Sequence, residues 1–206
     1  DTEAFTFDEA AGTVTVVDDG LAHWNLSMFG SDQEAYFTFS SVVTTATKQD
    51  LLLKVGGLGP NGAITDASRL LAIQYNAASS EVTVATLSPG GVWDTFLTLG
   101  GIDFVAGDRF GARSSQGGLV EVYRNDEPLG IADLSEGPSP WAYYDYGGYI
   151  GVWFEGAVGA SFGLFGGGTM PPVTAATRAF ARIQPPRPEQ TSTGTLGVRA
   201  MIGRAL

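Results

Sequence analysis

Stretches in which apolar and polar residues alternate one by one fill most of the first 170 residues of this 206-residue chain. A period of two is that of a β-strand whose two faces meet different surroundings. Gly, Asn, Asp and Ser separate these stretches at intervals of roughly 8–12 residues, the spacing of turns in an all-β sandwich. No long stretch with the 3.6-residue period of a helix occurs before residue 174. The pattern therefore predicts an all-β fold, an antiparallel two-sheet β-sandwich or jelly roll.

The alternation predicts twelve strands. In chain order they are residues 4–7, 12–17, 34–43, 49–55, 69–75, 81–87, 93–99, 108–114, 118–125, 128–133, 149–155 and 159–165. The clearest hairpin is VEVYRNDEPLGIAD, where Asn125 and Asp126 supply the tight turn because both residue types tolerate positive φ.

The chain is acidic, and this limits its partners. Its net charge is −11, with 22 acidic and 11 basic residues. Nucleic acids and anionic membrane surfaces are excluded as partners, because both are bound through clustered Lys and Arg. No apolar run approaches the roughly 20 residues of a membrane span, so membrane insertion is not expected. The absence of cysteine fits the cytosol or a bacterial or phage exterior and speaks against a small disulfide-stapled module.

Residues 171–206 differ in composition from the rest, and we call them the C-terminal arm. The arm has the Pro-rich composition of a linker and carries Pro171, Pro172, Pro185, Pro186 and Pro188. From residue 174 onward there are five Arg and one acid, whereas the first 173 residues hold six basic and 21 acidic residues. The sequence thus divides into a sandwich (1–170) and a basic arm (171–206), and the arm is expected to dock on acidic protein.

The segment TLGVRAMI in the arm alternates and predicts one further strand. Its apolar face needs a sheet to join, either in its own chain as a closing strand or in a neighbouring copy. For assembly with a neighbour, the candidate residues are Arg178, Arg182, Leu196, Val198, Arg199 and Ile202.

Residues 107–168 carry a family resemblance. GDRFGARSSQGGLVEVYRNDEPLG and GGYIGVWFEGAVGASFGLFGGG are similar to the C-terminal half of concanavalin A-like lectin/glucanase (LamG-like) domains of bacterial and phage surface proteins. Asp126 stands where the family's hairpin has Gly, and Leu164 stands where an acidic residue often precedes the closing Phe165. The resemblance implies a lectin-like sandwich, glycan binding and an extracellular or surface-exposed location. Because the chain starts at Asp1 rather than at Met, a processed product is expected.

Catalysis is not expected. Retaining glycosidases need two carboxylates about 5 Å apart, and the E-x-D-x-x-E strand of the hydrolases with this fold is absent from the sequence. His23 is the only histidine, so a His-based metal cluster is excluded, and it is expected to be a partly buried strand residue. No cofactor is required. A structural calcium ion held by Asp18, Asp19 and Asp145 is the one metal considered.

The segment WAYYDYGGYIGVWF (141–154) holds seven aromatic side chains in fourteen positions. In its strand, alternation places Ile150, Val152 and Phe154 on the core face, and Trp153 and Glu155 on the other face. Aromatic rings with a nearby carboxylate suit the stacking and hydrogen bonding of a sugar. The ligand-binding candidates are Trp141, Tyr143, Tyr144, Asp145, Tyr146, Trp153 and Glu155. The other reading is that these rings fill the core.

Two functions follow from these patterns. The first is a non-catalytic recognition module, binding a glycan or cell-surface polysaccharide within a larger bacterial or phage surface assembly. The second is a purely structural subunit of an extracellular filament, fibre or virion that self-assembles through the C-terminal arm.

Overall fold

The computed structural model describes residues 4–137 and 139–171 and confirms the all-β prediction. Each of the twelve expected strands is present, and Gly20–His23 forms one that alternation did not predict. The elements are β1 (Phe5–Asp8), β2 (Thr13–Val16), β3 (Gly20–His23), β4 (Gln33–Ser41), β5 (Lys48–Gly56), the 3₁₀ helix η1 (Pro60–Gly62), β6 (Arg69–Asn76), β7 (Glu81–Ser88), β8 (Val92–Gly100), β9 (Arg109–Ser114), β10 (Leu119–Arg124), β11 (Glu127–Asp133), β12 (Tyr149–Glu155) and β13 (Ser161–Thr169).

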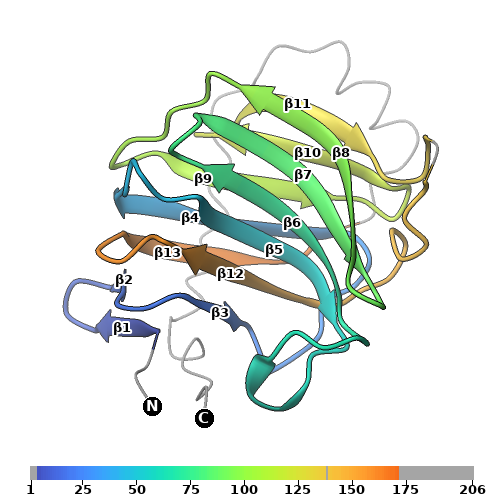
Figure 1. The fold of residues 1–206 in the computed structure, drawn as a ribbon, viewed down its shortest axis with the longest axis horizontal. Helices are drawn as coiled ribbons and strands as arrows, with labels where there is room; N and C mark the ends of the chain where they lie inside the picture. The colour runs from blue at the N-terminus through green and yellow to red at the C-terminus, as the bar shows by residue number, and fades with distance from the viewer. Residues whose placement is uncertain (1–3, 138, 172–206) are drawn as a thin grey trace.

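The strands form two antiparallel sheets, which Figure 1 shows stacked as the layers of a sandwich. Sheet A has the order β1-β2-β13-β4-β9-β10-β11, and sheet B has the order β3-β12-β5-β6-β7-β8. The predicted hairpin joins β10 to β11, and its turn residues Asn125 and Asp126 have φ values of 54° and 67°. Both turn residues with positive φ are typical of the type I′ turn, whose twist matches that of the strands.

The core lies between the two sheets. Ile150, Val152 and Phe154 are buried in it, which confirms the face predicted for β12. From sheet A, Phe37, Phe39 and other rings meet them, and Phe37 and Phe154 have ring centroids 5.9 Å apart. Edge and tilted ring pairs of this kind add packing specificity to the apolar area that is buried.

Five loops gather at one end of the sandwich, which we call the loop end. The strand registers place them there: Tyr149 pairs with Val55, Leu70 with Leu87, and Gln33 with Ser114. The loops are 24–32, 57–68, 89–91, 115–118 and 134–148. The described chain also ends here, because Thr169 pairs with Gln33. Within the described residues, no helix has the length and apolarity needed to span a membrane.

Candidate functional site

The structure places Trp141 in the core. Its side chain is 2% exposed and belongs to the main cluster between the sheets. The loop 134–148 crosses from β11 in sheet A to β12 in sheet B, and Trp141 fills the space between the layers where the loop crosses. A ring this deeply buried offers no face to a ligand, so Trp141 is a packing residue. Tyr144 is partly buried against the same core, and its N–H donates to the Trp141 carbonyl at 3.2 Å.

Tyr143, Tyr146 and Arg69 form an aromatic cluster at the loop end. The rings of Tyr143 and Tyr146 meet edge to face with centroids 5.5 Å apart. The Arg69 guanidinium carbon lies 5.6 Å from the Tyr143 centroid and 5.3 Å from that of Tyr146, within the range of cation–π contact. Tyr146 is 51% exposed, and the preceding residue, Asp145, is exposed as well. We call Arg69, Tyr143, Asp145 and Tyr146 the loop-end site.

The buried side chain of Lys54 fixes the backbone of the loop-end site by hydrogen bonds. It is fully buried, and its Nζ donates to the carbonyls of Ser31 at 2.5 Å and of Tyr146 at 3.1 Å. These carbonyls come from two different loops, so one ammonium group ties both loops to β5. Lys54 reaches them because it has a φ of 54° at a register irregularity between β5 and β6. Burial lowers the pKa of Lys54 to about 8, against the opposing effect of Asp32 and Asp145.

Gln33 is the second buried side chain that fixes these loops. Its amide oxygen accepts the backbone N–H of Lys54 at 2.8 Å, and its amide nitrogen donates to the carbonyls of Phe29 and Gly148. Gln33 is itself fully buried. Buried side-chain amides that satisfy backbone groups fix loop geometry, because every alternative position leaves polar atoms unpaired.

Trp153 and Glu155 lie on the outer face of sheet B, as the alternation predicts, and belong to a different surface from the loop-end site. Trp153 packs against an aliphatic cluster that includes Leu52, and its centroid lies 6.2 Å from that of Trp93. Lys48 Nζ lies 3.6 Å from the Trp153 centroid and pairs with Glu155 at 2.9 Å. Lys48 therefore pairs with the Glu155 carboxylate and covers the Trp153 ring.

The residues considered for calcium are not brought together. Gly20 pairs with Phe154, which places Asp18 and Asp19 at the end of the sandwich opposite the loop end, far from Asp145. One Asp19 oxygen accepts the N–H of Gly156 at 2.7 Å. Among the described residues, no group of three or more His, Asp or Glu side chains could hold a metal ion. His23 ends β3, half buried, with its pKa lowered by that burial and its ring 5.3 Å from Tyr149.

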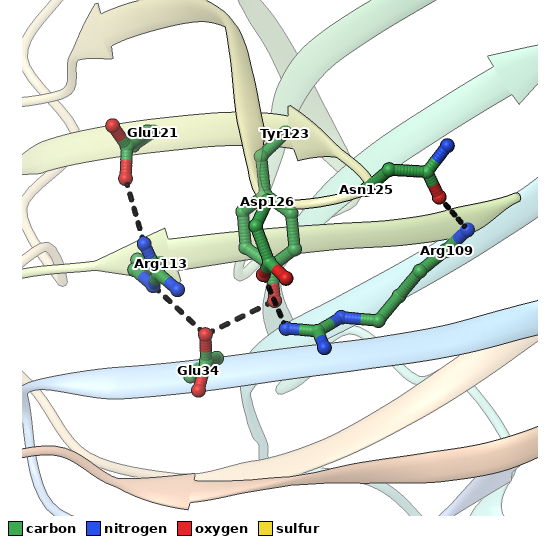
Figure 2. Close-up of polar contacts among 7 residues, drawn as sticks. All are labelled: Glu34, Arg109, Arg113, Glu121, Tyr123, Asn125 and Asp126. Atoms are coloured by element: carbon green, nitrogen blue, oxygen red, sulfur yellow. Dashed lines mark hydrogen bonds and ion pairs between the residues drawn. The ribbon is translucent and has the colours of Figure 1, made fainter. Parts of the chain in front are cut away.

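The outer face of sheet A carries a polar network that the sequence did not reveal (Figure 2). Three strands contribute one row of it, because Glu34 on β4 pairs with Arg113 on β9, which pairs with Glu121 on β10. Arg113 donates from Nε to Glu34 at 2.8 Å and from Nη1 to Glu121 at 3.3 Å. The Tyr123 hydroxyl donates to the same Glu34 oxygen at 3.0 Å. We call this surface the sheet A face.

The assembly candidates of the C-terminal arm, Arg178, Arg182, Leu196, Val198, Arg199 and Ile202, lie outside the described residues. The arm begins just beyond the loop end, since the N–H of Met170 donates to the carbonyl of Asp32 at 2.8 Å.

Comparison with known proteins defines the class of fold. No model of a protein family matches the sequence, and no curated protein does. Solved structures do match. A Bacillus subtilis protein described as having a galectin-like fold and unknown function has 13% identity and a TM-score of 0.58, over 80% of this chain and 86% of that one. The chain therefore has a lectin-like β-sandwich fold.

Two further structures align over most of the chain with lower scores. The carbohydrate-binding module CBM66 from Bacillus subtilis has 8% identity and a TM-score of 0.49, over 81% of this chain and 92% of that one. A carbohydrate-binding module of a Ruminococcus gnavus sialidase, bound to α2,3-sialyllactose, has 12% identity and a TM-score of 0.42, over 73% and 87%.

Proposed function

We propose that this protein is a non-catalytic glycan-binding module and that its loop-end site binds the sugar. The observation that carries the proposal is the half-exposed ring of Tyr146, held in place by Tyr143 and Arg69 and next to the exposed carboxylate of Asp145. The carbon face of a sugar ring is apolar and stacks on an aromatic ring, while a carboxylate accepts hydrogen bonds from the hydroxyls.

Preorganisation supports the same proposal. Lys54 holds the backbone carbonyl of Tyr146, and Gln33 holds that of Gly148 two residues later. A ring whose backbone is already fixed loses little conformational freedom when a ligand stacks on it, so more of the contact energy remains as affinity. The resemblance of residues 107–168 to LamG-like domains supports the finer part of the proposal, an extracellular module in a bacterial or phage surface assembly.

The test is retention of the protein on immobilised neutral and acidic polysaccharides. Tyr146→Ala should lose retention at least tenfold, whereas Tyr146→Phe keeps the stacking ring and should retain most of it. Asp145→Asn should weaken binding, and Glu9→Gln, a change at an exposed acid in the opposite β1–β2 turn, is the matched control. Unchanged retention of Tyr146→Ala on every polysaccharide that the wild type binds would refute the loop-end site.

The second candidate function is a structural subunit that assembles through the C-terminal arm. Exposed apolar side chains at the loop end favour it, since Leu26 is 73% exposed, Met28 58% and Val92 54%. The described chain ends at the same end of the sandwich, and the arm's excess of arginine complements the acidic sandwich. The occupant would be the arm of a neighbouring copy. Deleting residues 174–206 should then convert an assembly into a folded monomer, measured as molar mass by light scattering, and a truncated chain that still assembles would exclude it.

A further inference from the structure

On the sheet A face, side chains of paired residues on neighbouring strands form rows, and their rings lie along the sheet surface. In the second row, Tyr36 pairs with Gly111, which pairs with Tyr123. A Cβ atom on Gly111 would stand 2.1 Å from the Tyr123 ring, so the ring lies directly on the glycine backbone. Tyr36 lies in the same way over Gly166 of β13, where a Cβ would stand 2.7 Å from its hydroxyl. Glycines therefore make room for two rings along the sheet.

Two guanidinium groups lie on these rings. The Arg113 guanidinium carbon is 4.7 Å from the Tyr123 centroid, and that of Arg109 is 4.6 Å from the Tyr36 centroid. Tyr123 is buried as a result, and both burial and the nearby Glu34 raise the pKa of its hydroxyl. The solvent side of this surface thus carries planar guanidinium groups over both rings, with Tyr123 buried and Tyr36 partly exposed.

Acidic partners fix the guanidinium groups from the sides. Arg113 pairs with Glu34 and Glu121, and Arg109 pairs with Asp126 in the hairpin turn at 2.5 Å. The side chains remain between 22% and 59% exposed. Figure 2 shows them converging on one patch from β4, β9, β10 and the turn. Ion pairs of this exposure contribute little stability, commonly below 1 kcal/mol each, so stability is a weak explanation for five charged groups held in register.

The patch keeps hydrogen-bonding capacity beyond its internal pairing. Arg113 donates from Nε and Nη1, and among the described residues its Nη2 has no partner. A carboxylate accepts about four hydrogen bonds, and Glu121 accepts one in the described part of the chain. Alternating donors and acceptors fixed side by side match the hydroxyls of a polyol, each of which donates and accepts. Three carboxylates against two guanidinium groups disfavour an anionic ligand.

We propose that the sheet A face is a second binding surface, separate from the loop-end site, that takes a neutral glycan segment. The surface does not depend on the loop-end aromatics, since none of its residues contributes to that site. A module with two such surfaces gains avidity on a polysaccharide, because binding at one surface raises the effective concentration of sugar at the other.

Amide chemical-shift mapping on the full chain tests both surfaces at once. The probes are cellohexaose and mannohexaose as neutral glycans and a hexameric oligogalacturonate as the anionic one. The proposal expects shifts on β4, β9 and β10 with a neutral probe, weaker or absent with the anionic probe, and retained in Tyr146→Ala. Glu121→Gln should weaken binding at this face about tenfold, the effect of one charge-assisted hydrogen bond.

The control is Glu81→Gln on sheet B, an acid whose carboxylate likewise accepts a side-chain hydrogen bond, from Ser79. Shifts restricted to residues 57–68 and 134–148 would overturn the second surface and leave the loop-end site standing. Stronger shifts on β9 and β10 with oligogalacturonate would overturn the assignment to a neutral ligand. No shift at either surface with any probe would overturn this proposal and the loop-end site together.

Discussion

Replacing Lys54 with Met tests how the loop end is held. Met has nearly the same length and fits the buried path, but it carries neither the charge nor the donors that bind the carbonyls of Ser31 and Tyr146. Burial lowers the pKa of Lys54 from 10.5 to about 8. A difference of this size corresponds to about 3 kcal/mol against the charged form in the folded protein.

The sign of the pH dependence follows from where the proton binds more tightly. Since the folded pKa lies below the unfolded one, the unfolded chain keeps a proton between about pH 8 and 10.5 that the folded chain has released. Unfolding becomes less favourable as pH rises through this range. The free energy of unfolding of the wild type should therefore gain about 2 kcal/mol between pH 7 and pH 10 relative to Lys54→Met.

Urea denaturation of both proteins at pH 7 and pH 10 measures this difference. Tyr75 and Tyr123, whose pKa values burial raises, also contribute to the pH dependence, but they are present in both proteins and their contributions cancel. Amide exchange in residues 29–32 and 144–148 should be faster in Lys54→Met at pH 7, because two loop carbonyls have lost their donor. The difference in unfolding free energy between the wild type and Lys54→Met should change with pH. If it is the same at pH 7 and pH 10 within about 0.5 kcal/mol, a pKa of Lys54 lowered by burial is refuted.

Three further outcomes are expected. Burial raises the pKa of Asp50 well above 3.8, so above about pH 4 the folded chain holds a proton that the unfolded chain has released. The free energy of unfolding of the wild type should therefore fall relative to that of Asp50→Asn as pH rises from about 4 toward 7. Urea titrations that show a rise would contradict this. Gly111→Ala places a Cβ against the Tyr123 ring and should lower the free energy of unfolding by about 1–3 kcal/mol. Gly100→Ala is the control and should leave it nearly unchanged, because a Cβ there has no atom within 4 Å. Equal losses of stability in the two variants would contradict this reasoning. Trp141→Ala should cost about 3–5 kcal/mol as a core truncation, seen as a lower Tm, and a variant of unchanged Tm would mean that Trp141 is not a core residue.

The strands could be predicted from the sequence because alternation encodes burial directly. In β4, Ala35, Phe37 and Phe39 face the core and the intervening residues face out, so each residue reports its own surroundings. Strand β3 was missed because all four of its residues are half buried, which leaves no alternation to read. For Trp141 the sequence leaves a ligand-binding ring and a core ring both open, since a loop has no period that separates an inward from an outward side chain, and the structure shows a core ring.

The sheet A face could not be predicted because it depends on which strands are neighbours. Glu34 and Arg113 are 79 positions apart, and each looks like an ordinary outward residue of an isolated strand. Only the order β4-β9-β10 and its register make them a row. The burial of Lys54 could not be predicted for a different reason. In the strand LLLKV a lysine is expected to face solvent, but the positive φ of Lys54 breaks the regular alternation and its side chain is buried.

The position of the N-terminal strands has a consequence for how the chain folds. In the described residues, β2 pairs with β1 and β13, and β3 pairs with β12 alone. Strands β2 and β3 therefore pair with β13 and β12 only after the eight described strands between them in the sequence have been made. Pairings of such high sequence separation slow folding, so the sandwich is expected to close late, with the β1–β2 hairpin unpaired on one side until β13 is available.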